Sequence, residues 1–342
     1  MDEQVSETAI RKDEHLQICL EKDVNARHSA GFELVKLKIS ALPDLDLDKI
    51  DTSKEIFGKT LRAPLLISSM TGGSQTTKYY NQILAQAAEH FGVAMGVGSQ
   101  RAAIENNELE ESFGIVRKVA PNTLLFANLG VAQLNQGYGI EECQRAVEMI
   151  EADGLYLHLN ALQEALQPEG NRNFSDILKK IEAICNALPV PVLVKEVGCG
   201  VDKDSAIKLV DVGVKAIDVA GLGGTSWAAV EMYRQTDPMR KAVSESFIDW
   251  GIPTVAALKD LEEVKGKVTI ISSGGLDSGI DMAKSLALGA DICGFARKFL
   301  LAVEKGEKTL HQTIEQILLE LRISLFCTGS GSLSEIKGKW YS

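Results

Sequence analysis

The sequence predicts a (β/α)8 barrel, and three observations favour this fold. From residue 64 onward, short apolar runs alternate with longer stretches of helical periodicity, which indicates a parallel sheet with helices between its strands. Eight strand–helix units fit into roughly 235 residues, close to the ~250 residues that such a barrel typically takes. Polar or glycine residues end nearly every apolar run, where the site-forming loops of a barrel begin. An open doubly wound sheet is the alternative, and the crowding of polar strand ends favours the barrel.

The expected strands are apolar runs of the length typical of buried parallel strands. They cover residues 64–70, 92–99, 123–130, 154–160, 191–198, 216–221, 268–275 and 291–297. The expected helices carry apolar residues at helical spacing and cover residues 77–91, 140–152, 175–188, 204–213 and 281–289. Gly213 and Gly289 stand where glycine commonly terminates a helix.

We expect the barrel to form the centre of one domain that spans residues 1–342. Its core covers about 64–305, with an N-terminal segment, 1–63, before it and a C-terminal helical extension, 306–342, after it. The segment 222–252, between the sixth and seventh strands, is long and polar, and we expect it to cross the top face of the barrel.

The composition of the 342-residue chain is typical of a soluble globular protein, with 45% hydrophobic and 24% charged residues. Its net charge of −11 argues against a nucleic-acid partner, which needs a basic surface. No apolar run approaches the roughly 20 residues of a membrane span, and the polar N-terminus has no apolar signal region. The six cysteines include no CxxC pair, so we expect reduced thiols in a cytoplasmic protein and no structural zinc site.

Two glycine-rich strand ends indicate a phosphate site. Gly274 and Gly275 lie in ISSGGLDSG (271–279), and Gly294 lies in ICGFAR (292–297). Glycine lets backbone N–H groups close on an anion, and the loops after strands seven and eight of many barrels bind phosphate. Ordinary turns are the alternative for either loop alone, but the two loops in this order favour phosphate.

Lys195, in the fifth strand, has two interpretations. A lysine can extend to the barrel rim, or it can act as a fixed cation beside a cofactor that gains negative charge. A reduced flavin is such a cofactor. From the residues alone, the prediction is a phosphate-bearing ligand at the top of the barrel.

The stretch LHLNALQEALQPEG (157–170) gathers His158, Asn160, Gln163 and Glu164 at the end of the fourth strand. His158 and Asn160 are two residues apart on a strand, so they share one face. A buried histidine is more often a satisfied core residue than a catalyst. The amides and the carboxylate beside it favour a functional site here.

With these motifs the chain resembles the type 2 isopentenyl-diphosphate isomerases, which are FMN-dependent barrels. The likeness runs in order through RKDEH (11–15), SSMTGG (68–73), GVGSQR (96–101), FANLG (126–130), HLNALQE (158–164), QPEGNRNF (167–174), VKEVG (194–198), GLGGTSW (221–227) and SSGGLDSG (272–279). It covers essentially the whole chain, and HLNALQE with QPEGNRNF is its most specific part.

The resemblance implies interconversion of isopentenyl and dimethylallyl diphosphate, a 1,3 shift of a double bond. It implies reduced FMN with no net redox change, Mg²⁺ for the diphosphate, NADPH as flavin reductant, and a tetramer or octamer. The implied FMN residues are Ser69, Met70, Thr71, Ser99, Asn128, Lys195, Thr225, Gly274, Gly275, Gly294 and Ala296. The implied substrate residues are Arg11, Lys12, Arg101, His158, Asn160 and Gln163, with Glu164 as the Mg²⁺ ligand and Gln163, His158 and Lys195 as the catalytic set.

Physical chemistry adds expectations to these roles. Arg11 and Lys12 are adjacent, which suits a strap over the ligand rather than one face of a helix; a solvated charge pair is the alternative. His15 either fixes this strap by hydrogen bonding or lies on the surface. Glu164 can serve as the protein's Mg²⁺ ligand if the diphosphate and water supply the rest. Gln163 is a poor acid, so we assign it positioning or relay and leave the acid–base work to the flavin.

One loop departs from the family pattern. Relatives commonly carry an arginine two residues after SSGG, where this chain has Leu276 and Asp277. An aspartate there would repel a phosphate unless it turned outward or capped the next helix, and we expect Asp277 to be an N-cap. Arg297, after the eighth strand, could compensate for the missing arginine.

Three other functions compete with this one. A 2-hydroxy-acid oxidase with FMN needs a histidine base late in the barrel, and no histidine occurs between residues 158 and 311. A nucleotide-base dehydrogenase needs a nucleophilic cysteine, for which Cys199 is the candidate. A non-catalytic flavin-binding protein would explain the glycine loops but not the polar cluster at 158–164.

Overall fold

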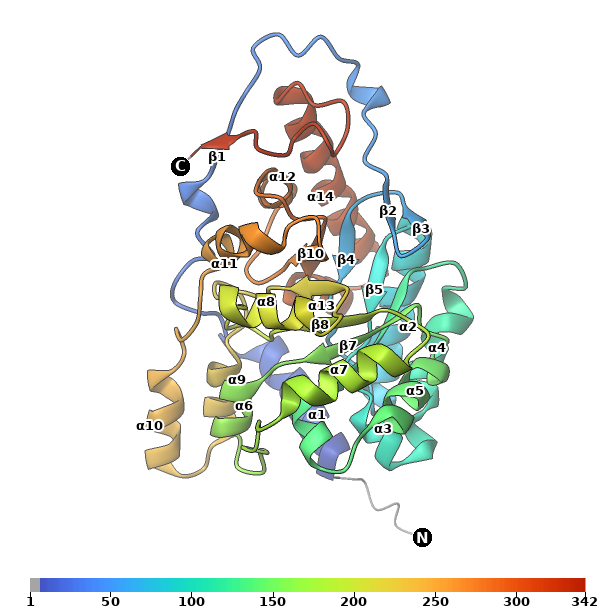
Figure 1. The fold of residues 1–342 in the computed structure, drawn as a ribbon, viewed down its shortest axis with the longest axis vertical. Coiled ribbons are helices and arrows are strands. Elements are labelled where there is room, and N and C mark those ends of the chain that lie inside the picture. The colour runs from blue at the N-terminus through green and yellow to red at the C-terminus, as the bar shows by residue number, and fades with distance from the viewer. Residues whose placement is uncertain (1–6, 342) are drawn as a thin grey trace.

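The computed structural model describes residues 7–341, and its central strands close into a parallel barrel (Figure 1). In order around the barrel they are β4 (Leu65–Ile67), β5 (Ala94–Gly96), β6 (Leu125–Gly130), β7 (Gly154–His158), β8 (Val192–Lys195), β9 (Ala216–Asp218), β10 (Thr269–Ser272) and β11 (Ile292–Phe295), which pairs with β4. Each lies within its predicted range, so the barrel is confirmed. In the described chain, no helix is both long and apolar enough to cross a membrane. The one-domain expectation stays a prediction, and residues 1–6 and 342 of it lie outside the described residues.

Helices form where the periodicity predicts them. They are α2 (Gln75–Phe91), α5 (Ile140–Met149), α7 (Ile177–Ala187), α8 (Lys203–Asp211) and α12 (Gly279–Ala287). Gly213 and Gly289 follow α8 and α12 with φ of +96° and +102°. This left-handed conformation is accessible to glycine without strain, so both predicted helix ends are confirmed.

Further helices complete the shell or lie at the ends of the barrel. They are α1 (Glu7–Glu21), α3 (Arg101–Glu105), α4 (Glu111–Val119), α6 (Ala161–Leu166), α9 (Trp227–Arg234), α10 (Pro238–Ser246), α11 (Thr254–Asp260), α13 (Arg297–Glu304) and α14 (Glu307–Cys327). Short 3-10 helices cover Phe32–Leu34, Leu47–Lys49, Asn107–Leu109, Val131–Asn135 and Leu261–Val264. Figure 1 places α9 and α10 at the same end of the barrel as α1 and α6. The expected excursion of 222–252 across this face is therefore confirmed, and α14 confirms the helical C-terminal extension.

A hairpin closes the opposite end of the barrel. It consists of β2 (Lys54–Ile56) and β3 (Lys59–Leu61), and its Ile56 and Leu61 pack with the interior residues Leu66, Phe126 and Tyr156. A second small sheet pairs β1 (Lys36–Leu37) with β12 (Trp340–Tyr341) and joins the N-terminal segment to the C-terminal tail. Because the hairpin fills one end, a ligand cavity is available only toward the other, where the strands end.

The expectation that Arg11 and Lys12 form an extended strap is wrong, because both lie within helix α1. Thr8, Lys12, Leu16 and Cys19 recur at helical spacing, and this face of α1 is turned toward the barrel. Arg11 and Lys12 therefore belong to a helix that is docked on the barrel. Lys12 lies closer to the barrel than the side chain of a solvated charge pair would.

Candidate active site

The carboxyl ends of the strands surround a cavity of about 790 Å³, a size typical of a small-molecule site. Every residue that the sequence analysis assigns to FMN, substrate or Mg²⁺ lines this cavity. They lie at the carboxyl ends of different strands or on the loops and helices that follow, and Arg11 and Lys12 are added from α1. The structure therefore brings the whole candidate set together at one face of the barrel.

His158 ends β7 beside Asn128 of β6. The Asn128 amide nitrogen donates to the Val97 carbonyl (3.1 Å), so its oxygen accepts from His158 Nδ1 (2.8 Å). Nε2 is then the unprotonated nitrogen of a neutral ring. Burial, with the nearby charges of Lys195 and Lys12, lowers the pKa of His158 to about 3. His158 is therefore a neutral hydrogen-bond acceptor at physiological pH.

Lys195 ends β8 in register with His158. Its Nζ donates to the Glu196 carbonyl at 2.6 Å. Burial lowers the pKa of Lys195, while the carboxylates of Asp218 and Glu196 oppose that shift. Lys195 thus lies buried in the interior wall of the barrel, next to the neutral imidazole of His158.

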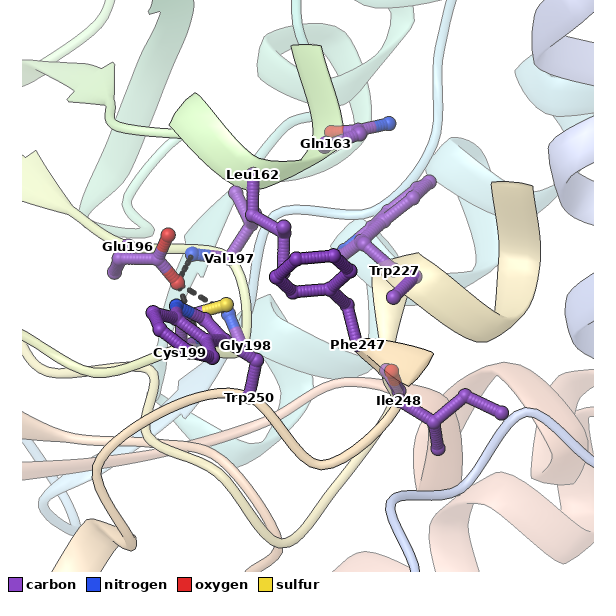
Figure 2. A pocket seen from close by; sticks show the side chains of 12 residues that line it. Leu162, Gln163, Glu196, Val197, Gly198, Cys199, Trp227, Phe247, Ile248 and Trp250 are labelled. Atoms are coloured by element: carbon purple, nitrogen blue, oxygen red, sulfur yellow. Dashed lines mark hydrogen bonds between the residues drawn. The ribbon is translucent and has the colours of Figure 1, made fainter. Parts of the chain in front are cut away.

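The loop after β8 borders a second, small cavity of about 10 Å³ (Figure 2). The Glu196 carboxylate accepts from the backbone N–H groups of Val197 (2.6 Å), Gly198 (2.7 Å) and Cys199, which fixes the loop. Cys199 lines this small cavity and not the large one. Burial, with Glu196 beside it, raises the pKa of the Cys199 thiol to about 12. A protonated thiol is a poor nucleophile, so the structure does not support Cys199 as a catalytic base or nucleophile.

Both ends of the Gln163 amide are bonded. Its Nε2 donates to Glu231 Oε1 of α9 (3.1 Å), and its Oε1 accepts from Asn160 Nδ2 (3.4 Å). His15 Nε2 of α1 contacts the same Glu231 oxygen at 3.0 Å, and the imidazole packs edge-on against Trp227. His15 therefore fixes the N-terminal segment by hydrogen bonding, although that segment is a helix and not a strap. Gln163 is held in one orientation, which suits a positioning role.

Glu231 connects this network to an arginine. Its side chain is 0% exposed, and Oε2 accepts from Arg234 Nη1 at 2.8 Å. Burial would raise the pKa of Glu231, but hydrogen bonding and charge from His15, Arg234 and Gln163 lower it. Arg234 also donates to Glu14 of α1 (3.0 Å) and to Glu169 after α6 (2.9 Å). One charge network therefore joins the three elements that surround the mouth of the cavity.

Three cations converge at this mouth, Arg11 and Lys12 from α1 and Arg101 from α3. Burial lowers the pKa of Arg11, and the proximity of Arg101 lowers it further. Burial and Arg11 together lower the pKa of Lys12 to about 7. Glu169, 3.6 Å from Arg11, and Glu105, 2.7 Å from Arg101, offset only part of this unfavourable crowding of like charges. The cluster therefore fits a multivalent anion such as a diphosphate.

Glu164 and Asn160 offer the oxygen atoms that Mg²⁺ prefers. Glu164 Oε1 accepts from Asn160 Nδ2 (3.0 Å) and Oε2 from the backbone N–H of Asn171 (2.6 Å). Asn160 Oδ1 is buried and has no hydrogen-bond partner in the described part of the chain. Within residues 7–341, no group of three or more His, Cys, Asp or Glu side chains could hold a metal ion. A Mg²⁺ ion at Glu164 would take its remaining ligands from a bound diphosphate and water, as the sequence analysis expects.

The floor of the cavity fits the edge of a planar ring. A Cβ at Gly96 would lie 2.5 Å from Ser69 Oγ, and a Cβ at Gly294 would lie 2.4 Å from Ser68 Oγ. The hydroxyls of Ser68 and Ser69 are buried without a partner among the described residues. Close backbone approach thus leaves two unpaired hydroxyls at a cavity that Lys195 also lines. This is the pattern that an isoalloxazine, with its oxygen and nitrogen edge, would occupy.

The phosphate loop differs from expectation at Asp277. Gly274 and Gly275 line the cavity with φ of +98° and +76°, a conformation that lets backbone N–H groups face an anion. The expectation that Asp277 caps the next helix is wrong, because Ser278 is the N-cap of α12. Asp277 turns outward instead, with its side chain 84% exposed, and pairs with Lys298 at 2.7 Å. Its charge therefore faces solvent.

Arg297, the suggested substitute for the missing arginine, bonds to the end of helix α1. Its Nε donates to the Cys19 carbonyl (2.8 Å), Nη2 to the Lys22 carbonyl (3.0 Å) and Nη1 to Asn25 Oδ1 (3.1 Å). These acceptors lie at and just after the C-terminal end of α1, whose carbonyls have no helical partners. Arg297 thus holds α1 against the barrel, and because it also lines the cavity, its suggested phosphate role stays a prediction.

Sequence comparison places the chain among known proteins. Residues 143–342 match the family model of FMN-dependent dehydrogenases. An isopentenyl-diphosphate delta-isomerase of Nostoc sp. is 47% identical over 333 residues, which cover 97% of this chain and 95% of that protein. The same-named proteins of Synechocystis sp. (49% over 330 residues; 96% and 94% covered) and Rickettsia canadensis (47% over 326 residues; 95% and 95% covered) are similarly related. The chain belongs to the isopentenyl-diphosphate delta-isomerase family.

Solved structures agree on the fold. A flavocytochrome b2 variant superposes with a TM-score of 0.70 at 18% identity and covers 96% of this chain and 82% of its own. A mandelate oxidase variant gives 0.68 at 18% identity, with 96% and 97% covered. At this identity the likeness shows the barrel alone. Family membership makes the protein an FMN-dependent isomerase-family enzyme, and it decides against a non-catalytic flavin-binding protein.

Sequence reasoning missed several residues around this isomerase-family cavity. Glu231 and Arg234 lie in a segment that mixes polar and apolar residues, so nothing in its pattern separates a buried carboxylate from exposed ones. Trp227 ends the quoted motif GLGGTSW without a role. Asp218, buried at the end of β9, stands within an apolar run of the sequence. A charged residue in such a run was the one signal available for it.

Proposed function

We propose that the enzyme interconverts isopentenyl diphosphate and dimethylallyl diphosphate by a 1,3 proton shift, with FMN in its reduced form, Mg²⁺, and NADPH as flavin reductant. The observation that carries this proposal is the meeting of Arg11, Lys12 and Arg101 with Glu164 at the mouth of one cavity. The names of relatives at 47% identity support it.

The mouth would bind the diphosphate. Arg11 and Arg101 present planar guanidinium donors, and Lys12 adds a point charge. Glu164, with the unpaired oxygen of Asn160 beside it, would hold Mg²⁺ against the phosphate oxygens. An anion bound here would relieve the repulsion between Arg11 and Arg101, which is a favourable contribution to substrate binding.

The floor would bind FMN. The proposed residues are Ser69, Met70, Thr71, Ser99, Asn128, Lys195, Thr225, Gly274, Gly275, Gly294 and Ala296, all of which line the cavity. Thr71 would contribute through its backbone or methyl group, because its hydroxyl donates to Asn81 at 2.6 Å. Reduced FMN supplies an electron-rich ring and a titratable nitrogen for acid–base chemistry at carbon.

Between the mouth and the floor of the cavity, side chains of the protein would orient the five-carbon part of the substrate. Gln163 is fixed by Glu231 and Asn160, so its amide presents one face to the cavity. His158 presents Nε2 as an acceptor, and a diphosphate oxygen nearby would favour its protonated form. Trp227 lines the same cavity and excludes water from a cationic or radical-like centre.

We also propose that the enzyme acts in the cytoplasm as a homo-oligomer, a tetramer or an octamer. Large apolar side chains stand exposed on its outer surface, including Met239 (65%) and Trp250 (61%). Light scattering after size exclusion measures the assembly directly.

The decisive assay of function is anaerobic. Protein reconstituted with FMN, reduced with NADPH and supplied with Mg²⁺ and isopentenyl diphosphate should form dimethylallyl diphosphate, followed by NMR. Omitting Mg²⁺ or leaving FMN oxidised should abolish product. A parallel assay with 2-hydroxy acids should show no oxygen consumption. Oxygen uptake with a hydroxy acid and no isomerisation would refute the proposal.

A further inference from the structure

Four buried polar atoms without partners among the described residues either line the cavity or lie in the barrel interior below it. They are Ser68 Oγ, Ser69 Oγ, the Tyr156 hydroxyl and Asp218 Oδ2, none of which has a hydrogen-bond partner among the described residues. Barrel interiors are normally filled by bulky apolar side chains, and buried polar groups are nearly always bonded. A bound flavin would explain the unpaired hydroxyls of Ser68 and Ser69, because both serines line the cavity. It would not by itself explain the buried carboxylate of Asp218, which does not line the cavity.

Asp218 is the most unusual member of this group. It is 0% exposed and stands on β9, where it is the register partner of Lys195 on β8. Its Oδ1 accepts from Ser273 Oγ (2.5 Å) and from the Ala220 N–H (3.3 Å). Two donors on one oxygen stabilise an ionised carboxylate. Asp218 itself does not line the cavity, so it would act on a ligand through a neighbour.

Lys195 is that neighbour. Register partners on adjacent parallel strands project to the same side of the sheet, so both side chains point into the barrel. Lys195 Nζ donates to the Glu196 carbonyl rather than to Asp218, so the two charges interact without a direct hydrogen bond. Burial lowers the pKa of Lys195 and raises the pKa of Asp218, and each charge opposes the shift of the other. Either charge alone would be costly at this depth, whereas the pair is mutually stabilising.

We propose that Asp218 is a positioning residue for the bound flavin: its carboxylate holds Lys195 as an ammonium ion beside the ring and so sets how tightly FMN binds and how readily it is reduced. A flavin gains negative charge at its N1/O2 edge on reduction, so a fixed cation there favours the reduced form. The inference rests on the proposed function only in taking reduced FMN as the working cofactor.

The test measures FMN affinity by fluorescence quenching and the flavin midpoint potential by anaerobic dye-coupled titration. Asp218→Asn keeps the size and removes the charge. Lys195 should then lose its proton, so the potential should fall and FMN affinity should weaken about tenfold, as in Lys195→Gln. The double variant should match Lys195→Gln alone, because Asp218 acts through Lys195.

Two further variants make the result specific. Ser273→Ala removes one donor from Asp218 and should lower the potential in the same direction by a smaller amount. Asp153→Asn is the matched control, because Asp153 lies outside the cavity, paired with Lys59 (2.8 Å) and Arg117 (3.0 Å). It should leave the potential unchanged.

A potential that rises in Asp218→Asn would overturn the inference, because loss of a negative charge beside an intact ammonium ion has that effect. An unchanged potential, or additive effects in the double variant, would overturn it as well. If Asp218→Asn does not fold, the direction of the shift in Ser273→Ala decides. None of these readouts uses the diphosphate substrate. Wild-type protein that binds no FMN would refute the proposed function, whereas normal FMN binding with an unshifted variant would refute only the role of Asp218.

Discussion

Replacing Glu231 with glutamine would test how the mouth of the cavity positions its residues. The carboxylate accepts from Gln163 (3.1 Å), His15 (3.0 Å) and Arg234 (2.8 Å). A glutamine keeps the shape but replaces one oxygen by an NH₂ group. Whichever way the new amide turns, it places a donor against at least one existing donor.

The cost follows from burial. Breaking a buried charge pair by changing one partner typically costs about 3–5 kcal/mol, and the retained acceptor of glutamine favours the lower end, about 3 kcal/mol. The entropy of unfolding is about 2.1 cal/mol/K per residue, or about 0.7 kcal/mol/K for a chain of this length. Glu231→Gln should therefore lower Tm by about 4 °C. Misorientation of Gln163 should lower kcat at least about tenfold, equivalent to about 1.4 kcal/mol in the transition state.

The assay combines a thermal melt, FMN affinity and isomerase kinetics. FMN affinity should stay near the wild-type value, because Glu231 does not line the cavity. Glu182→Gln, at an exposed position of α7, is the matched control and should change none of the three quantities. A Glu231→Gln enzyme with wild-type kcat would refute the reasoning, since it would show that the orientation of Gln163 does not matter.

Four further predictions test individual residues. Gln163→Ala should lower kcat far more than FMN affinity, and turnover near the wild-type rate would exclude its positioning role. The value of kcat/KM should fall as pH rises through about 7, where buried Lys12 loses its proton, and Lys12→Arg should flatten that fall in a pH–rate profile. Glu164→Gln should raise the Mg²⁺ concentration needed for half-maximal activity about tenfold or more, while chelation of Mg²⁺ should leave the flavin spectrum unchanged. Arg297→Ala should raise KM for the diphosphate severalfold without changing FMN affinity. Weaker FMN binding instead would support a role of Arg297 at the FMN phosphate.

The barrel could be predicted from the sequence because its elements are local and repeated. Each strand is a short apolar run, and each is followed by a segment of helical periodicity. This repeat predicts that the strands follow one another around the barrel in chain order. The polar cluster His158–Glu164 could be predicted for the same reason. Its residues are close in the chain, and strand geometry directs them to one face.

The docking of α1, the burial of Glu231 and the start of α12 depend on contacts between distant parts of the chain, which no local sequence pattern indicates. Helix α1 is rich in charged residues, and its orientation is set by distant partners such as Arg297. Glu231 is buried only because α1, α6 and α9 meet around it. Asp277 and Ser278 are both good N-cap residues, and the choice between them depends on where α12 begins. In each case the deciding term is tertiary packing.

The arrangement divides the work of the site between two pieces of the chain. The proposed flavin floor belongs to the barrel, whose backbone is shared with flavocytochrome b2 at 18% identity. The cations Arg11 and Lys12 belong to α1, which is docked by Arg297 and by bonds from Lys12 Nζ to the carbonyls of Gly72 (2.6 Å) and Ser99. Those carbonyls lie on loops that also line the cavity. A diphosphate that draws Lys12 toward itself must therefore loosen its bonds to these loops, so binding of the substrate and the position of the flavin floor are physically coupled through α1.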